Sequence, residues 1–191
     1  MDKLNKLNLG CGEDKKEGYI NLDWNPLTRP DIIHDLNELN YPFDDGSFDE
    51  ITASHVLEHL EKPFLIMKEL HRLLKPGGRL IIKVPHFSRG FTHAEHARGF
   101  DITFPLYFNE KYTSSGFIGV EFELKKMKLK WIAFSHLLHH MGYGRTSIFL
   151  INTADQLISF LANLSPAFCS RIWCFWVGGF EEIEFNFKCV K

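Results

Sequence analysis

LNLGCG at residues 7–12 and GYINLD at residues 18–23 form the stretch that decides the fold. The pattern predicts a short apolar strand, a glycine turn without side-chain bulk, and a second strand that ends at Asp23. A Gly-x-Gly turn lets a ligand approach the backbone closely, and its N–H groups suit an anionic group. An acid at a strand tip can accept hydrogen bonds from both hydroxyls of a ribose. Together these features predict a nucleoside-containing cofactor.

The connection between the two strands is too short for a standard dinucleotide site. Only Glu13–Gly18 separate the glycine turn from the next strand, whereas a parallel crossover normally needs about a dozen residues, usually with a helix. The acid also arrives sooner than the spacing of about 20 residues that is typical of NAD sites, and the third glycine is missing. The stretch therefore argues against an NAD-binding unit.

Strand and helix signals alternate further along the chain. We expect strands at Asp31–Leu36 and Phe48–Ser54, then one helical turn at Val56–Leu60. A helix begins at Pro63, because proline suits the first turn and the apolar residues that follow have helical spacing. Pro76-Gly77-Gly78 ends it, and the apolar run 79–84 predicts a buried parallel strand. This alternation predicts an α/β open sheet.

The regular alternation of strand and helix signals ends at Pro85. A helix is expected at Asn109–Phe117, and alternation over Glu121–Ile132 predicts a strand with a bulge at Lys125-Lys126. Alternation over Ile183–Cys189 predicts a half-buried strand that pairs antiparallel at one side of the sheet. The segment 133–179 is long and apolar and has no clear assignment.

Composition is that of an ordinary globular protein. The chain has 191 residues, 45% hydrophobic and 24% charged, with a net charge of −2. We expect one domain over residues 1–191, and neither nucleic acid nor an anionic membrane is favoured by the overall charge. No apolar signal region opens the chain and the four cysteines form no Cys-x-x-Cys pair, so we expect free thiols and a cytoplasmic location.

LNLGCG, YINLD, HDL, SFDEITASHVLEHL and LHRLLKPGGRLIIKVP together resemble class I S-adenosylmethionine-dependent methyltransferases. The likeness is greatest to a small branch that resembles methyltransferase type 11 and has a shortened first crossover. It covers roughly residues 4–85. It implies a Rossmann-like open sheet, mostly parallel with an antiparallel C-terminal strand and helices on both faces. The cofactor half would be about 1–85, with substrate-side insertions at about 86–120 and 133–179.

The resemblance also implies a set of cofactor contacts. The glycine turn would pass beneath the methionyl part and ribose, Asp23 would hold the ribose diol, and Trp24 would lie against the adenine. Asp35 would accept from the adenine amino group beside a backbone contact from Leu36, and two residues at the tip of the fourth strand would face the methionyl end. The full predicted set is Leu9, Gly10, Cys11, Gly12, Asp23, Trp24, Asp35, Leu36, Ser54 and His55.

Histidines are the candidates for proton transfer. His86, His93 and His96 follow the fifth strand on the side where substrate should arrive, and the unperturbed pKa of histidine lies near neutral pH. His136, His139 and His140 have helical spacing, but no thiolate or His-Glu-x-x-His pattern accompanies them, so no metal site is expected. Glu58 and His59 are interpreted as a surface turn.

The sequence therefore predicts a methyltransferase that moves a methyl group from S-adenosyl-L-methionine to an O, N or C atom of a small-molecule, sugar or lipid-linked acceptor. A non-catalytic protein that binds S-adenosylmethionine as a scaffold or partner subunit is the alternative. No nucleic-acid partner is expected. The apolar segments near Leu157–Phe160 and Ile172–Val177 are interpreted first as core or as a lid over a pocket. A homodimer interface is possible for the same segments, and peripheral membrane contact is less favoured.

Overall fold

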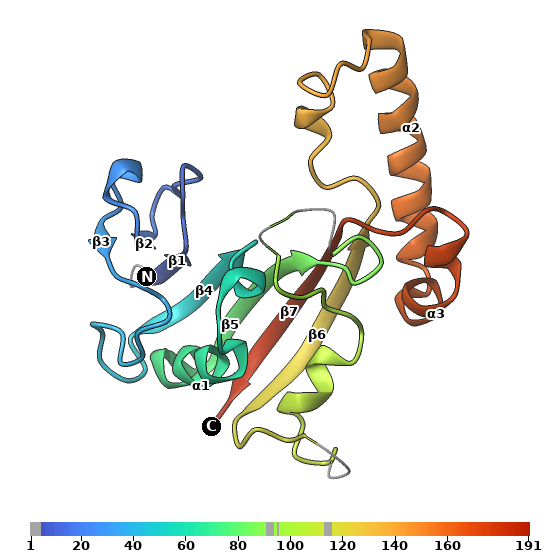
Figure 1. Cartoon of the computed structure of the whole chain (residues 1–191). Helices are drawn as coiled ribbons and strands as arrows, with labels where there is room; N and C mark the ends of the chain where they lie inside the picture. The colour runs from blue at the N-terminus through green and yellow to red at the C-terminus, as the bar shows by residue number, and fades with distance from the viewer. Residues whose placement is uncertain (1–4, 91–93, 95, 113–115) are drawn as a thin grey trace.

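A single mixed sheet organises the chain. The computed structural model describes residues 5–90, 94, 96–112 and 116–191, and its sheet has the strand order β3-β2-β1-β4-β5-β7-β6 (Figure 1). The strands are β1 (Lys6–Leu9), β2 (Ile20–Asp23), β3 (Ile32–Ile33), β4 (Phe48–Ser54), β5 (Leu74–Pro85), β6 (Glu121–Lys130) and β7 (Glu182–Val190).

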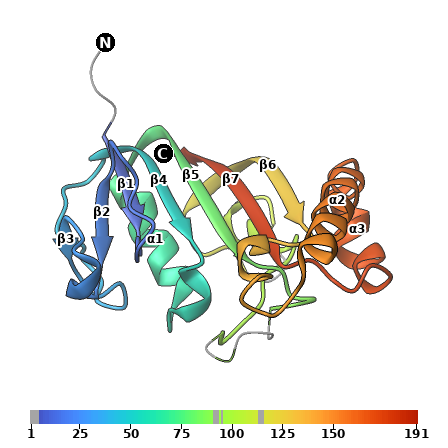
Figure 2. The ribbon, with the colours of Figure 1, turned by 90° about the horizontal axis from the view of Figure 1, so that it is seen from above.

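Strands β1 to β5 pair in parallel, and β7 runs antiparallel to both β5 and β6. This confirms the predicted fold class, with an antiparallel C-terminal strand in a mostly parallel sheet. The predicted bulge is present, because the pairing of β6 with β7 shifts register between Leu124 and Lys126. Figure 2 shows β1, β2 and β4 pointing the same way, so their carboxyl ends meet at one edge.

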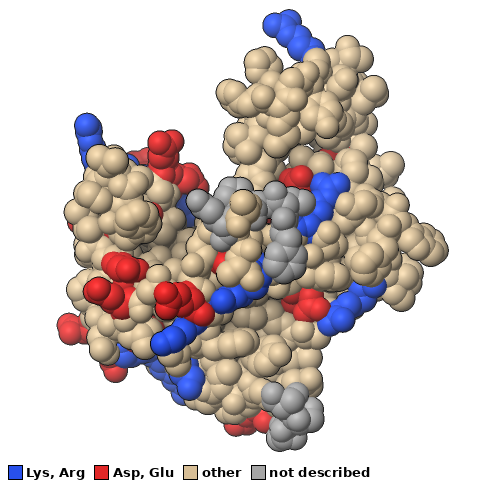
Figure 3. Space-filling model, viewed as in Figure 1, with Lys and Arg blue, Asp and Glu red and all other residues tan. Residues whose placement is uncertain are grey.

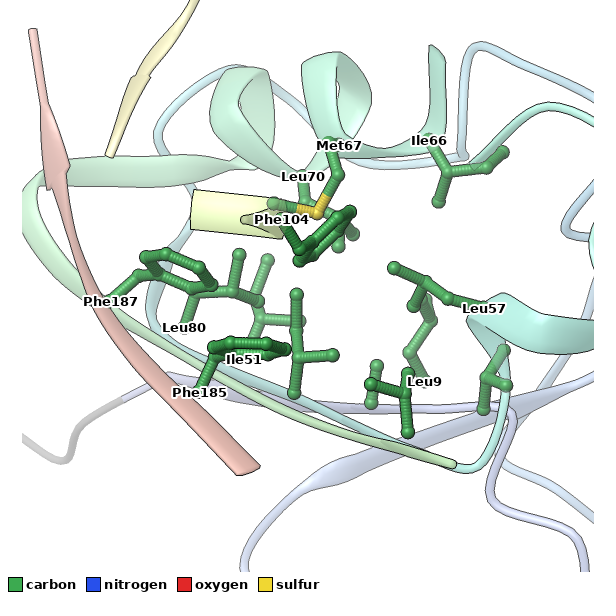
Figure 4. Packing of buried hydrophobic residues seen from close by; sticks show 14 of the residues in the cluster. Leu9, Ile51, Leu57, Ile66, Met67, Leu70, Leu80, Phe104, Phe185 and Phe187 are labelled. Atoms are coloured by element: carbon green, nitrogen blue, oxygen red, sulfur yellow. The ribbon is translucent and has the colours of Figure 1, made fainter. Parts of the chain in front are cut away.

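One face of the sheet carries the hydrophobic core. Alternate residues of neighbouring strands place Leu9 beside Ala53 and Leu80 beside Phe187 on this face, and all are buried. Helix α1 (Pro63–Leu73) packs Met67 and Leu70 onto it, both completely buried. The turn η3 (Phe104–Phe108) adds Phe104, whose ring lies 5.5 Å from that of Phe185, centroid to centroid, at an interplanar angle of 47° (Figure 4).

The other face is polar, and among the described residues no α-helix covers it. The short β1–β2 connection crosses it: the Lys16 ammonium donates to Thr52 Oγ1 (2.7 Å), and Tyr19 hydrogen-bonds to Glu50, which also pairs with Arg79. The ten residues between β1 and β2 include the glycine turn and leave no room for a crossover helix. The helical layer expected on this second face is therefore replaced by polar side chains and a tight loop.

Two further helices lie beside the β6 end of the sheet. Helix α2 (Arg145–Ala162) projects away from the body and is followed by α3 (Pro166–Arg171). Asn163 accepts from the Leu129 N–H (2.9 Å) and donates to the Leu129 carbonyl (2.8 Å), and Ser159 accepts from the Trp131 N–H (3.0 Å). Side chains from the end of α2 thus occupy the outer hydrogen-bonding edge of β6.

The remaining helical turns are short. They are η1 (Pro26–Thr28), η2 (Leu57–His59), η4 (Ser135–Leu137) and η5 (Trp173–Phe175). The predicted single turn after the fourth strand is η2. The helix expected at Asn109–Phe117 is wrong in its described part, because the helical turn is η3 and Asn109 already has an extended backbone. No described helix has the length and apolar character needed to cross a bilayer.

Candidate active site

A cavity opens at the carboxyl edge of the parallel strands. Its volume is about 480 Å³. Six of the ten predicted cofactor residues line it, together with four residues that follow β3 and β4. The lining is Gly10, Asp23, Trp24, Asp35, Leu36, Asn37, His55, Val56, His59 and Leu60. Ligands in open α/β sheets bind at this edge, so the cavity coincides with the place that the fold prepares for a ligand.

Gly10 is required where the chain turns out of β1. Its φ is +59°, in the left-handed region, and a Cβ at this position would lie 2.5 Å from Val56 Cγ2. A side chain would therefore strain the backbone and collide with the segment that follows β4. The close approach of these two segments forms one wall of the cavity.

Asp23 is the buried acid of the site. It ends β2, is 6% exposed, and accepts hydrogen bonds from the N–H groups of Gly12 (Oδ2, 2.8 Å) and Asn25 (Oδ1, 2.9 Å). These two bonds orient the carboxylate and link it to the glycine turn. Each oxygen retains a second acceptor site, so Asp23 can also accept from ligand hydroxyls.

Two predicted residues form the outer rim of the cavity. Trp24 is 68% exposed, so its indole offers an open flat surface. Asp35 is exposed and follows the short strand β3 by two residues, and its Oδ1 accepts from the N–H of Asn37. Leu36 is buried behind them. An aromatic face and a carboxylate on one rim suit a flat base with an amino group.

The other four predicted cofactor residues do not line the cavity. Leu9 and Cys11 are buried, so their side chains pack in the interior, and only their backbone can contact a ligand. Gly12 lies behind the Asp23 carboxylate. Ser54 is the last residue of β4. A cofactor contact for each of these residues stays a prediction.

His55 is held between two carboxylates. Its Nε2–H donates to Glu182 (2.9 Å) and its Nδ1–H donates to Glu58 (3.2 Å). Burial lowers the pKa of His55, but the hydrogen bonds and charges of Glu182 and Glu58 outweigh burial and raise this pKa to about 9. His55 is therefore an imidazolium at neutral pH. Its φ of +55° is unusual for a residue with a side chain.

The three predicted proton acceptors have different surroundings. His86 is completely buried, its ring nitrogens lie 2.7 Å from Ser88 Oγ and 2.8 Å from Ser170 Oγ, and burial lowers its pKa to about 4. The structure thus corrects the prediction for His86, whose imidazole is a packing group that does not reach the cavity. His93 lies outside the described residues. His96 lies beside His59 of the cavity wall, with ring centroids 5.0 Å apart.

Sequence reasoning missed three acidic or histidine residues at this site. Glu58 is completely buried, so the surface turn expected for it is wrong, and His59 lines the cavity. Glu182 comes from β7, more than 120 residues away along the chain. The spacing of Glu58 and His59 contained no burial signal, and the contact of Glu182 with His55 depends on the order of strands in the sheet.

A second cavity lies between α1 and η3. Its volume is about 540 Å³, and its walls include Phe64, Phe100, Phe104 and Tyr107. Its lining begins at Glu61, next to Leu60 of the first cavity, and Arg98 of its wall donates to the Leu60 carbonyl (2.8 Å). An aromatic cavity beside a polar one suits a second, more apolar ligand.

Comparison with known proteins identifies the first part of the chain. Residues 11–82 match the family described as a methyltransferase domain. The matched part covers less than half of the chain and is similar to class I S-adenosylmethionine-dependent methyltransferases, as the sequence predicted. The cofactor that this domain implies is S-adenosylmethionine.

Curated relatives match over the same region. The chain is 41% identical over 87 residues to a demethylmenaquinone methyltransferase of Clavibacter sepedonicus, which is 41% of this chain and 35% of that protein. It is 44% identical over 50 residues to a protein of the same name from Staphylococcus epidermidis, which is 26% of this chain and 20% of that one. The matches thus span about a third or less of these relatives.

Solved structures agree on the fold over nearly the whole chain. An S-adenosylmethionine-dependent methyltransferase from Mesorhizobium loti has a TM-score of 0.57 at 14% identity, covering 98% of this chain and 93% of that one. The [4+2]-cyclase SpnF has a TM-score of 0.54 at 15% identity, covering 98% and 75%. Since a cyclase shares the architecture, the fold alone does not fix the reaction.

Proposed function

We propose that the chain transfers a methyl group from S-adenosylmethionine to an O, N or C atom of a small-molecule, sugar or lipid-linked acceptor. The observation that carries the proposal is the cavity at the carboxyl edge, which combines the oriented Asp23 carboxylate with the close-packed Gly10 turn. These features fit a nucleoside ligand, because a buried acceptor faces the cavity and the turn at Gly10 carries no side chain of its own.

In this proposal the residues of the cavity bind and orient the cofactor. Asp23 accepts from the ribose hydroxyls, Trp24 contacts the adenine face, and Asp35 accepts from the adenine amino group. When bound, S-adenosylmethionine supplies a methyl group that its sulfonium already activates. The protein mainly has to align the acceptor for in-line displacement and to exclude water. The aromatic cavity at Phe64 and Phe104 is our candidate for the acceptor pocket.

Titration calorimetry with S-adenosylmethionine and, separately, with NAD tests the first step. We expect binding of S-adenosylmethionine, and about 10- to 100-fold weaker binding by Asp23→Asn, because hydrogen bonds to a charged group contribute about 1.5–3 kcal/mol. Asp44→Asn is the matched control, since Asp44 is exposed in the turn before β4. A preference for NAD, or equal affinities in the wild type and Asp23→Asn, would contradict the proposal.

The alternative function is a scaffold that binds the cofactor without catalysis. Incubation with methyl-labelled S-adenosylmethionine and a broad panel of hydroxyl, amine and carbon acceptors separates the two. Transfer of label to any acceptor supports the enzyme. Tight binding without transfer across the whole panel supports the scaffold.

Apolar exposure on α2 favours a membrane-surface form of the same enzyme as a second candidate. Phe149, Leu150, Leu157 and Phe160 are each at least 60% exposed, and their helical spacing places them on one stripe of about 100°. The only acid of α2, Asp155, is buried and paired with Lys130. Figure 3 shows this arm almost free of charged side chains. An uncharged apolar stripe of this kind suits insertion into a lipid interface.

Flotation with anionic and neutral liposomes tests this second candidate. We expect the wild type to float and a Leu157→Glu/Trp176→Glu variant to stay at the bottom of the gradient, since both side chains are at least 60% exposed. Leu27→Glu is the control, because Leu27 is equally exposed but lies in η1. If the wild type does not float and light scattering gives twice the monomer mass, the stripe pairs two copies of the chain instead.

A further inference from the structure

Glu58 presents an unsatisfied oxygen in the protein interior. The side chain is 0% exposed. Its Oε1 accepts from His55, whereas its Oε2 has no hydrogen-bond partner within the part of the chain that the structure describes. A buried carboxylate oxygen without a partner costs free energy of several kcal/mol unless a donor or a cation satisfies it. The position therefore calls for a positively charged or proton-donating ligand.

Two imidazoles lie next to the Glu58 carboxylate. One ligand atom each from Glu58, His59 and His96 lies within 4.8 Å of the others. His96 Nδ1 lies 2.8 Å from the Gly90 carbonyl, which can only accept, so the ring proton is on Nδ1. Nε2 lies on the side of the carboxylate, 3.9 Å from Glu58 Oε1. A backbone carbonyl that fixes the tautomer of a histidine is a common support for a metal ligand.

The carboxylate is also supported from behind. His55 joins Glu58 to Glu182 by hydrogen bonds of 3.2 and 2.9 Å. Two carboxylates thus flank one imidazolium, and Lys83 Nζ lies 3.9 Å from the Glu182 carboxylate on the far side. Hydrogen-bonded partners of this kind orient a ligating carboxylate.

We propose that Glu58, His59 and His96 form a binding site for a divalent transition metal ion, with Zn²⁺ the best match. A set of two histidines and one glutamate is known to hold zinc with a fourth position open, at metal–nitrogen distances of about 2.0–2.1 Å. Tetrahedral binding requires ligand atoms about 3.3 Å apart, so the three side chains close by rotamer adjustments of an ångström or so. The metal site itself does not depend on the proposed methyl transfer.

The place of the metal ion gives it a role that rests on the proposed function. His59 lines the cofactor cavity, and the proposed acceptor pocket begins two residues further on, at Glu61, so an acceptor hydroxyl between the two cavities would reach the open position. A hydroxyl oxygen bound there loses its proton to solvent more readily, because the metal stabilises the oxyanion. The oxyanion then forms the O–CH₃ bond as the sulfonium S–CH₃ bond breaks, and its electron pair returns to sulfur. In this arrangement His96 is a metal ligand and not a proton acceptor.

Metal titration of the chelator-treated full chain tests the site. We expect one equivalent of Zn²⁺ to bind by calorimetry, and Co²⁺ to give the visible absorption of a four-coordinate complex. Glu58→Gln and His96→Ala should each weaken binding at least about 100-fold, because even outer partners of metal ligands contribute 10- to 100-fold. His139→Ala is the control, since His139 is exposed in the arm that precedes α2.

The thermal midpoint of unfolding provides a second measurement on the wild type and on Glu58→Gln. Zn²⁺ should raise it, and Glu58→Gln should abolish the rise while keeping a cooperative transition. Absence of stoichiometric binding, or equal affinity in the wild type and Glu58→Gln, would overturn the proposal. Metal binding without binding of S-adenosylmethionine would support the metal site and contradict the proposed function.

Discussion

At the scale of single residues, the site depends on carboxylates that accept hydrogen bonds from different segments of the chain. Asp23 links the glycine turn to the second strand, and its type and place followed from the sequence because it ends an apolar strand. Glu182 had no such signal, since it is one of several polar residues that alternate along β7. Its contact with His55 exists only because β7 inserts beside β5.

The charge of His55 leads to a prediction about pH. Because the pKa of His55 in the folded chain is about 9, above the unfolded value of about 6.5, its stabilising contribution is fully present below pH 6.5. It is lost as the pH rises through 9. We expect Glu182→Gln to lower the pKa of His55, and to lower the free energy of unfolding by about 2 kcal/mol below pH 6.5 but by little above pH 9.

Nuclear magnetic resonance of the His55 ring protons gives the pKa directly, and denaturant titrations between pH 5.5 and 9.5 give the free energy. Glu123→Gln is the control, because Glu123 pairs only with Lys125 on the exposed side of β6. An unchanged His55 titration in Glu182→Gln would show that Glu182 does not hold the imidazolium.

At the scale of elements, the sequence correctly predicted the strands and helices in which the apolar residues are the buried ones. Strand β4 was placed at its observed ends, and helix α1 begins at Pro63 as expected. Segment 133–179 could not be assigned because the outward stripe of α2 is apolar, so the usual contrast between a buried and a solvated face is missing. Near residue 109, the turn signals gave no information on η3, whose phenylalanines are fixed by tertiary packing.

His86 and Ser170 join β5 to α3, and this gives a prediction about elements. Both are completely buried, with Nε2 and Oγ 2.8 Å apart. We expect His86→Ala to lower the free energy of unfolding by about 2–4 kcal/mol, through a cavity and an unpaired hydroxyl. The affinity for S-adenosylmethionine should stay within about twofold, because His86 does not line the cofactor cavity.

Chemical denaturation and calorimetry measure the two quantities separately. His140→Ala, at an exposed histidine, should change neither. A large loss of cofactor affinity in a stable His86→Ala protein would restore His86 to the site.

At the scale of the whole molecule, the two faces of the sheet differ in kind. One face holds the apolar core under α1, and the other is covered by a short loop and paired charges. The shortened first crossover was predictable because only Glu13–Gly18 separate the glycine turn from the next strand. The polar second face was not predicted. The expected fold class has helices on both faces of the sheet, and the short connection between β1 and β2 leaves no room for one. Of the residues that line the cofactor cavity, the sequence predicted those at or next to the ends of strands.

The hydrogen bonds from Asn163 and Ser159 to β6 have a consequence for self-assembly. An outer strand with open N–H and carbonyl groups is a template for strands of other molecules. Here amide and hydroxyl side chains occupy the places that a foreign backbone would take at Leu129 and Trp131. Asn163→Leu should therefore speed the formation of fibrillar aggregates in thioflavin T assays, whereas Asn152→Leu, a change elsewhere on α2, should not. By this reasoning the side chains at the end of α2 block the edge of the sheet, so that strands of other molecules cannot extend it into a polymer.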